Sequence, residues 1–244
     1  MQSVLITGAN RGLGLGMVKY LLKQNKAEKI FATCRSSSEE LKTLSQENKH
    51  LHILQLDVTN TAKFEEVASQ ISQVVGARGL NVLINNAAVA TKFTKINLVK
   101  PEQLLENYAV NTVAPIILTK TLLPLLRQAS EANSDKPVGT QRAAVINLTS
   151  VLGSIAQNDQ GGYYPYRCSK AALNMATKSM SLDLQKDQIL VASVHPGWVR
   201  TDMGGSKAPL DVTTSINGLF DTIFKLREKD SGKFYQYDGT ELPW

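Results

Sequence analysis

The sequence has 244 residues, of which 43% are hydrophobic and 20% are charged, a composition typical of a globular protein with a sizeable core. Its 27 Lys and Arg exceed its 21 Asp and Glu, but no block of five or more like charges occurs, so nucleic-acid binding is not favoured. No apolar run approaches the length of about 18 residues that crosses a bilayer, which argues against a membrane protein.

The amino terminus leads directly into the apolar stretch Val4-Leu5-Ile6, without the basic head and cleavage site of a signal peptide. Cys34 and Cys168 lie far apart and form neither a C-x-x-C motif nor a metal-ligand spacing. We therefore expect free thiols, no metal site and a cytoplasmic location.

Short runs rich in Val, Ile and Leu alternate with segments of helical length, as in sheets that are covered on both faces. The predicted strands are residues 4–7, 29–34, 52–56, 81–85, 143–148, 190–195 and 234–237. The predicted helices are residues 12–24, 38–48, 62–75, 101–129, 166–185 and 213–227. This βαβ order predicts one α/β domain over residues 1–244: a Rossmann-type, doubly wound, mostly parallel sheet of about seven strands with helices on both faces.

A glycine-rich segment, TGANRGLG, follows the first predicted strand and leads into the first predicted helix. Its glycines permit a tight turn and let the backbone approach a pyrophosphate, whose charge is stabilised by the free N–H groups of the helix start. The segment lacks the Gly-Lys-Ser/Thr ending of a P-loop, which disfavours an ATPase. The residues expected to form this dinucleotide cradle are Gly8, Asn10, Arg11, Gly12, Leu13 and Gly14.

The second predicted strand ends in Cys34-Arg35, where an NAD-dependent enzyme normally places a carboxylate for the ribose hydroxyl. A guanidinium at this point can instead hold a 2′-phosphate, and Arg11 can add a second charge-assisted contact. We therefore predict NADP(H) as the cofactor, the alternative being that both arginines are solvated surface residues. Further cofactor positions expected at the carboxyl ends of strands are Asp57, Val58, Asn85 and Ala87.

Three tyrosines precede a lysine in YYPYRCSK, residues 163–170, at the predicted start of a helix. Residues four apart share a helix face, and among these tyrosines only Tyr166 has a lysine, Lys170, at that spacing. A phenol with a pKa of about 10 is a poor proton donor and base at neutral pH, but a neighbouring ammonium lowers that pKa. We therefore expect Tyr166 to be a general acid, the alternative being a surface pair at a helix start.

These motifs together resemble the short-chain dehydrogenase/reductase family, and the resemblance covers nearly the whole chain. The motifs that occur in the family's order are TGANRGLG, Asp57, NNAA, Asn111, Thr149-Ser150, Tyr166-x-x-x-Lys170 and HPGWVRTDM. The resemblance implies that Ser150 orients a substrate carbonyl, that Tyr166 protonates its oxygen, and that Lys170 lowers the tyrosine pKa and holds the nicotinamide ribose. It implies that Asn111 positions a water in a proton relay. The remaining residues that it places at the nicotinamide and its phosphates are Pro196, Gly197, Val199 and Thr201.

The chain departs from the family pattern in two places. NNAA stands where the family usually has NNAG, and Ser150 and Tyr166 are 16 residues apart, a longer separation than the family commonly shows. The surplus falls in QNDQGGYYP, which either shapes the substrate pocket or is a neutral surface insertion. This long loop, the Tyr-Arg-x-Ser-Lys form of the catalytic helix and the ending YDGTELPW resemble Sniffer-type carbonyl reductases.

The expected function is therefore that of an NADPH-dependent carbonyl reductase, which transfers hydride to the carbonyl of a small apolar ketone, aldehyde or quinone. The alternative is an NADP(H)-binding regulatory or scaffold protein without significant turnover, which would need only the cradle. His195 raises the idea of a Ser-His-Asp hydrolase, but the chain has no G-x-S-x-G motif, which favours a structural histidine. Trp198 and Met203 either contact substrate or pack their own loop. Proteins of this kind are commonly dimers or tetramers, which leaves a homodimer and a homotetramer open.

Overall fold

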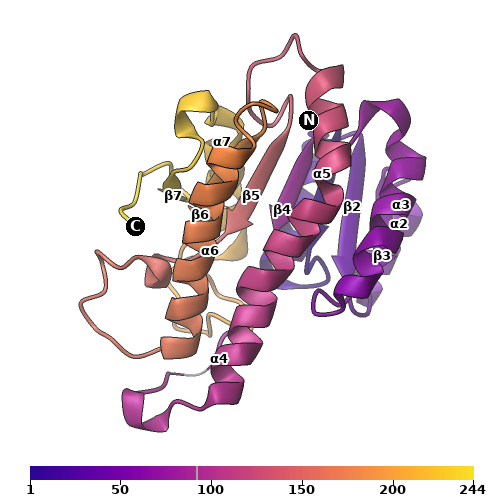
Figure 1. Cartoon of the computed structure of the whole chain (residues 1–244). Coiled ribbons are helices and arrows are strands. Elements are labelled where there is room, and N and C mark those ends of the chain that lie inside the picture. The colour runs from indigo at the N-terminus through magenta and orange to yellow at the C-terminus, as the bar shows by residue number, and fades with distance from the viewer. Residues whose placement is uncertain (92) are drawn as a thin grey trace.

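The apolar runs of the sequence form a seven-stranded sheet, seen in the computed structural model of Figure 1, which describes residues 1–91 and 93–244. Its strands are β1 (Ser3–Thr7), β2 (Lys29–Cys34), β3 (Leu51–Gln55), β4 (Val82–Asn85), β5 (Ala144–Leu148), β6 (Leu190–His195) and β7 (Phe234–Gln236). The strand order is β3-β2-β1-β4-β5-β6-β7, and every neighbouring pair is parallel. The predicted doubly wound sheet is thus confirmed, and the order reverses between β1 and β4, where such sheets bind ligands.

Helices cover both faces of the sheet. They are α1 (Gly12–Lys23), α2 (Glu39–Glu47), α3 (Phe64–Val75), α4 (Pro101–Tyr108), α5 (Ala114–Ala132), α6 (Tyr164–Asp183) and α7 (Val212–Lys225). Alternate residues of β1 serve the two faces: Val4 and Ile6 pack with apolar residues of α1 and α7, and Leu5 packs with those of α3 and α5. This alternation explains why Val4, Leu5 and Ile6 are apolar in succession.

The predicted helix 101–129 is interrupted. A π-helical turn, Ala109–Val113, joins α4 to α5, and the helix then continues to Ala132. By length and composition the segment Pro101–Ala132 could cross a membrane, but 56% of its most apolar stretch of 18 residues is buried inside the protein. Leu118, Leu122 and Leu126 of this segment belong to the core beneath the sheet, which accounts for its hydropathy.

The other predicted ends of strands and helices lie within three residues of the observed ones.

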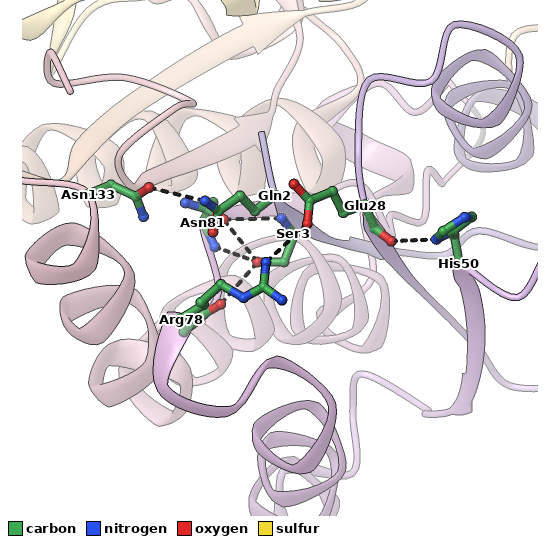
Figure 2. A network of polar contacts seen from close by, with 8 residues as sticks. Gln2, Ser3, Glu28, His50, Arg78, Asn81 and Asn133 are labelled. Atoms are coloured by element: carbon green, nitrogen blue, oxygen red, sulfur yellow. Dashed lines mark hydrogen bonds and ion pairs between the residues drawn. The ribbon is translucent and has the colours of Figure 1, made fainter. Parts of the chain in front are cut away.

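At the amino ends of the strands a polar network joins β1 to the loop that enters β5 (Figure 2). Asn81 Oδ1 accepts hydrogen bonds from the backbone N–H and the hydroxyl of Ser3, both at 3.1 Å, and Asn81 Nδ2 donates to the Arg142 carbonyl at 2.9 Å. The motif residues of the sequence lie at the carboxyl ends of the strands. This network therefore belongs to the edge of the sheet that is remote from the candidate site.

Candidate active site

The turn between β1 and α1 is shaped for close approach of a ligand. Gly8 has φ of +67°, a left-handed backbone that favours glycine, and a Cβ built on Gly14 would lie 2.2 Å from the Gly8 carbonyl oxygen. Within the described part of the chain, no side chain caps the start of α1, and its first turn carries no acidic residue. Its first N–H groups are therefore free for an anion, so the turn fits a pyrophosphate.

Thr7 and Asn86, which the sequence motifs contain but do not single out, hold this turn against the end of β4. Asn86 Nδ2 donates to the carbonyl oxygens of Thr7, at 2.7 Å, and Gly8, at 3.1 Å. Thr7 Oγ1 accepts hydrogen bonds from the N–H groups of Asn86 and Ala87, both at 3.0 Å. Both residues lie within the motifs, Thr7 in TGANRGLG and Asn86 in NNAA. A polar residue directly after a buried strand was the signal that could have indicated their role.

Arg35 is exposed directly after β2, and Asp57 follows the neighbouring strand β3. Asp57 Oδ1 accepts hydrogen bonds from the Thr59 N–H at 2.9 Å and hydroxyl at 2.7 Å. These bonds, and to a lesser degree the charge of Arg35, lower the pKa of the Asp57 carboxyl. Arg35 is thus exposed at the carboxyl end of β2, and the Asp57 carboxylate is held by hydrogen bonds within its own turn.

The segment after β6 lies against the glycine turn. Arg11 Nη1 and Asp202 Oδ2 form an ion pair at 2.8 Å, and Thr201 Cγ2 lies 3.4 Å from where a Cβ on Gly12 would be. Gly197 at the start of this segment has φ of +85°. Both charged side chains of the ion pair are exposed, so the pair is worth about 1 kcal/mol at most. Arg11 can therefore exchange Asp202 for a phosphate at low cost.

The side chains of two predicted asparagines are engaged inside the protein. Asn85 is buried and its Nδ2 donates to Asn147 Oδ1 at 2.8 Å, so its amide stabilises the sheet interior and does not face the cradle. Asn111, in the π-helical turn, donates from Nδ2 to the Val89 carbonyl at 2.9 Å and to Ser169 Oγ at 3.0 Å. Asn111 Oδ1 also accepts the Val89 N–H at 2.9 Å, so its whole side-chain amide is engaged, and the water-positioning role expected for Asn111 stays a prediction.

Ser150, Tyr166 and Lys170 meet at the carboxyl end of β5. Ser150 follows that strand, and its Oγ accepts a hydrogen bond from the Leu152 N–H at 3.1 Å. Lys170 Nζ donates to the Leu148 carbonyl at 2.8 Å and lies 5.7 Å from the centre of the Tyr166 ring. The structure thus brings together the three side chains that the sequence motifs singled out.

Burial dominates the acid–base properties of this group. Burial raises the pKa of Tyr166 to about 12, while its hydrogen bond with Ser150 acts in the opposite direction. Burial also lowers the pKa of Lys170 to about 7. Within the chain alone burial governs both groups, because loss of water disfavours the ammonium as well as the phenolate, and the expected lowering of the Tyr166 pKa by Lys170 stays a prediction.

The neighbouring tyrosines have other surroundings. Tyr163 occupies the N-cap position of α6 with φ of +50°, and its ring packs edge-on against Phe93 with centroids 4.9 Å apart.

The other end of the long loop is fixed by Ser154, whose Oγ donates to the Pro243 carbonyl at 2.8 Å. Trp198 is 55% exposed and donates from Nε1 to the carbonyl of Gly204 in its own loop, at 2.7 Å.

Comparison with known proteins agrees with this geometry. Residues 2–210 match the short chain dehydrogenase family. The chain is similar to the carbonyl reductase Sniffer of Drosophila melanogaster, with 50% identity, a TM-score of 0.99 and full coverage of both chains. It is also similar to an NADPH-bound carbonyl reductase from chicken fatty liver, with 38% identity and a TM-score of 0.94 over 100% of this chain and 99% of that one.

Among curated proteins, the chain is 41% identical to the C-signal of Myxococcus xanthus over 68% of this chain and 93% of that protein. The family match covers most of the chain, and the glycine turn and the Ser150, Tyr166 and Lys170 group lie within it. The chain therefore belongs to the short chain dehydrogenase family of oxidoreductases, and within it resembles the Sniffer-type carbonyl reductases.

Proposed function

We propose that this protein is an NADPH-dependent carbonyl reductase for small apolar ketones, aldehydes or quinones. The observation that carries the proposal is the meeting of Ser150, Tyr166 and Lys170 at the same edge of the sheet as a glycine turn that fits a pyrophosphate. The two similar carbonyl reductases, one of them NADPH-bound, support the same activity.

The residues around the turn account for the choice of cofactor. The uncapped start of α1 would hold the pyrophosphate, and Arg35 would hold the 2′-phosphate, with Arg11 as a second cation. No carboxylate follows β2 to bond a free ribose hydroxyl. When bound, NADPH supplies the hydride that reduces the carbonyl carbon.

The protein's own part in the reaction is to hold and move a proton. Ser150 Oγ accepts the Leu152 N–H, and its own hydrogen, which serves the hydrogen bond with Tyr166 in this structure, would turn to a carbonyl oxygen of the substrate. With a pKa of about 12, Tyr166 is protonated at neutral pH, as a proton donor must be before reaction. Lys170, buried nearby as an ammonium, would stabilise the phenolate that remains after the proton has moved to the substrate oxygen.

The proposal is tested by following NADPH absorbance at 340 nm with panels of ketones, aldehydes and quinones, while NADPH binding is measured separately by fluorescence. We expect NADPH binding and consumption with at least one of these carbonyl classes. Tight NADPH binding without consumption in any class would contradict the proposal and favour a regulatory or scaffold protein.

A further inference from the structure

Two buried polar atoms next to the proposed catalytic group have no hydrogen-bond partner within residues 1–91 and 93–244. They are Thr149 Oγ1 and His195 Nδ1. Thr149 is only 3% exposed, and His195 is only 8% exposed. Buried polar atoms are almost always hydrogen-bonded, to protein or to ordered water, so this pair requires an explanation.

The two atoms lie on adjacent strands. Leu148 of β5 pairs with Val194 of β6, and the Thr149 N–H continues the ladder by donating to the Val194 carbonyl at 2.9 Å. Thr149 and His195 are therefore the next pair along the strands. Because side chains alternate along a strand, both project from the face opposite to that of Leu148 and Val194.

That face is the one covered by α6. Asn147 and Ser193, two residues earlier on the same strands, both hydrogen-bond to Thr177 Oγ1 of α6, at 2.8 and 2.9 Å. Two residues further along, Thr149 and His195 share this face. The unpartnered atoms consequently lie between the sheet and the helix that carries Tyr166 and Lys170.

Lys170, on α6, is the cation whose charge acts on His195. An ammonium has three N–H donors, and the described chain accepts one of them, through the Leu148 carbonyl at 2.8 Å. Burial, and then the charge of Lys170, lower the pKa of His195 to about 4, while Asp238, from the turn after β7, acts in the opposite direction. At neutral pH the imidazole is therefore uncharged and has one nitrogen that accepts a hydrogen bond.

We propose that Thr149 Oγ1, His195 Nδ1 and the Lys170 ammonium bind one ordered water, and that His195 is thereby a positioning residue that keeps Lys170 protonated. The water accepts a hydrogen bond from Lys170 Nζ and donates its two hydrogens to Thr149 Oγ1 and to an unprotonated His195 Nδ1. Buried waters typically have two to four such partners. A hydrogen bond made by the ammonium favours the charged form, which opposes the burial that lowers the lysine pKa.

The kinetic test of this water rests on the proposed reductase function. His195→Leu and Thr149→Val remove one acceptor each. In either variant the pH above which kcat/KM falls should move down by about one unit. The reason is that loss of a hydrogen bond to the Lys170 ammonium should lower its pKa by at least about one unit. His195→Gln keeps an acceptor oxygen and should restore the profile, and the double variant should shift no further than His195→Leu. The matched control is His50→Leu at the remote amino edge (Figure 2), which should shift nothing.

A high-resolution crystal structure of the NADPH complex tests the water independently of turnover. Density for a water within hydrogen-bond distance of both Thr149 Oγ1 and His195 Nδ1 is the expected result. A pocket filled by protein atoms, or folded Thr149→Val and His195→Leu variants with an unchanged pH profile, would overturn the proposal. A wild-type protein that reduces no carbonyl would instead refute the proposed function, and the crystal structure would still decide the water site if a variant failed to fold.

Discussion

Tyr166 differs from Tyr163 and Tyr164 in its surroundings and not in its chemistry. Its ring lies 5.7 Å from Lys170 Nζ, whereas Tyr163 packs against Phe93 and caps α6. The four-residue spacing to a lysine was enough to single out Tyr166 from the sequence. The raised pKa of the phenol was not predictable, because it comes from burial by segments far away along the chain.

Removal of the phenol should therefore affect one tyrosine only. Tyr166→Phe should lower kcat by about 10² to 10⁴-fold, the range expected for loss of a general acid, with the NADPH dissociation constant nearly unchanged. Tyr163→Phe and Tyr164→Phe serve as matched controls and should keep kcat within a few-fold. Steady-state kinetics together with NADPH titration decide the matter, and a loss of similar size at position 163 or 164 would refute the assignment.

The lysine makes the reaction sensitive to pH. Burial lowers the pKa of Lys170 from its ordinary value to about 7, so the ammonium is lost as the pH rises through that value. Since the phenolate needs the positive charge, kcat/KM for carbonyl reduction should fall on the alkaline side, at or above about pH 7 because the proposed water opposes the effect of burial, and kcat/KM reports the free enzyme. Lys170→Arg, whose guanidinium stays charged, should remove this decline even if its absolute rate is lower. A profile that is flat from pH 6 to 9 in the wild type would contradict this account.

At the scale of elements, the cofactor cradle depends on the junction of β1 and α1. A Gly→Ala change inside a helix usually stabilises it by about 1 kcal/mol. Gly14 is an exception because its Cβ would lie 2.2 Å from the Gly8 carbonyl oxygen, so the turn would have to move. The sequence motif locates these glycines but does not show at which of them a side chain has no space.

Gly14→Ala should therefore reduce the increase in Tm that NADPH produces, by displacing the turn that holds the pyrophosphate. Gly16→Ala is the control in the same helix, since its Cβ would meet Val212 of α7 at 2.6 Å and not the turn. We expect Gly16→Ala to lower Tm but to keep the NADPH-dependent increase. Thermal unfolding with and without NADPH measures both, and an undiminished NADPH effect in Gly14→Ala would argue against this cradle.

The end of β2 should set the choice between the two nicotinamide cofactors. A hydrogen bond to the charged 2′-phosphate is worth roughly 1.5 to 3 kcal/mol, so Arg35→Ala should raise KM for NADPH at least about tenfold and leave KM for NADH almost unchanged. Arg11→Ala should have a smaller effect, because Arg11 gives up its ion pair with Asp202 when it binds phosphate. A wild-type protein that uses NADH as well as NADPH would show that Arg35 is a surface residue.

At the scale of the whole molecule, the alternation of apolar and helical segments was sufficient to predict the parallel sheet and its covered faces, because the central strands β1, β4, β5 and β6 bury residues on both sides. Three features depended on tertiary packing and were missed. They are the π-helical turn at Asn111, the inward side chain of Asn85 and the docking of Ser154 on Pro243. The last two are contacts between segments distant along the chain, and the π-helical turn places Asn111 against Ser169 of α6, so no local pattern encodes them.

The central claim is that hydride from NADPH reaches a carbonyl carbon while Tyr166 provides the proton. Its most direct test uses NADPH deuterated at the transferring position, with mass spectrometry of the product alcohol. The account predicts that the wild type places the deuterium on the former carbonyl carbon, and that Tyr166→Phe forms this product at least about 100-fold more slowly. An alcohol without deuterium, or one formed equally fast by the phenylalanine variant, would contradict it.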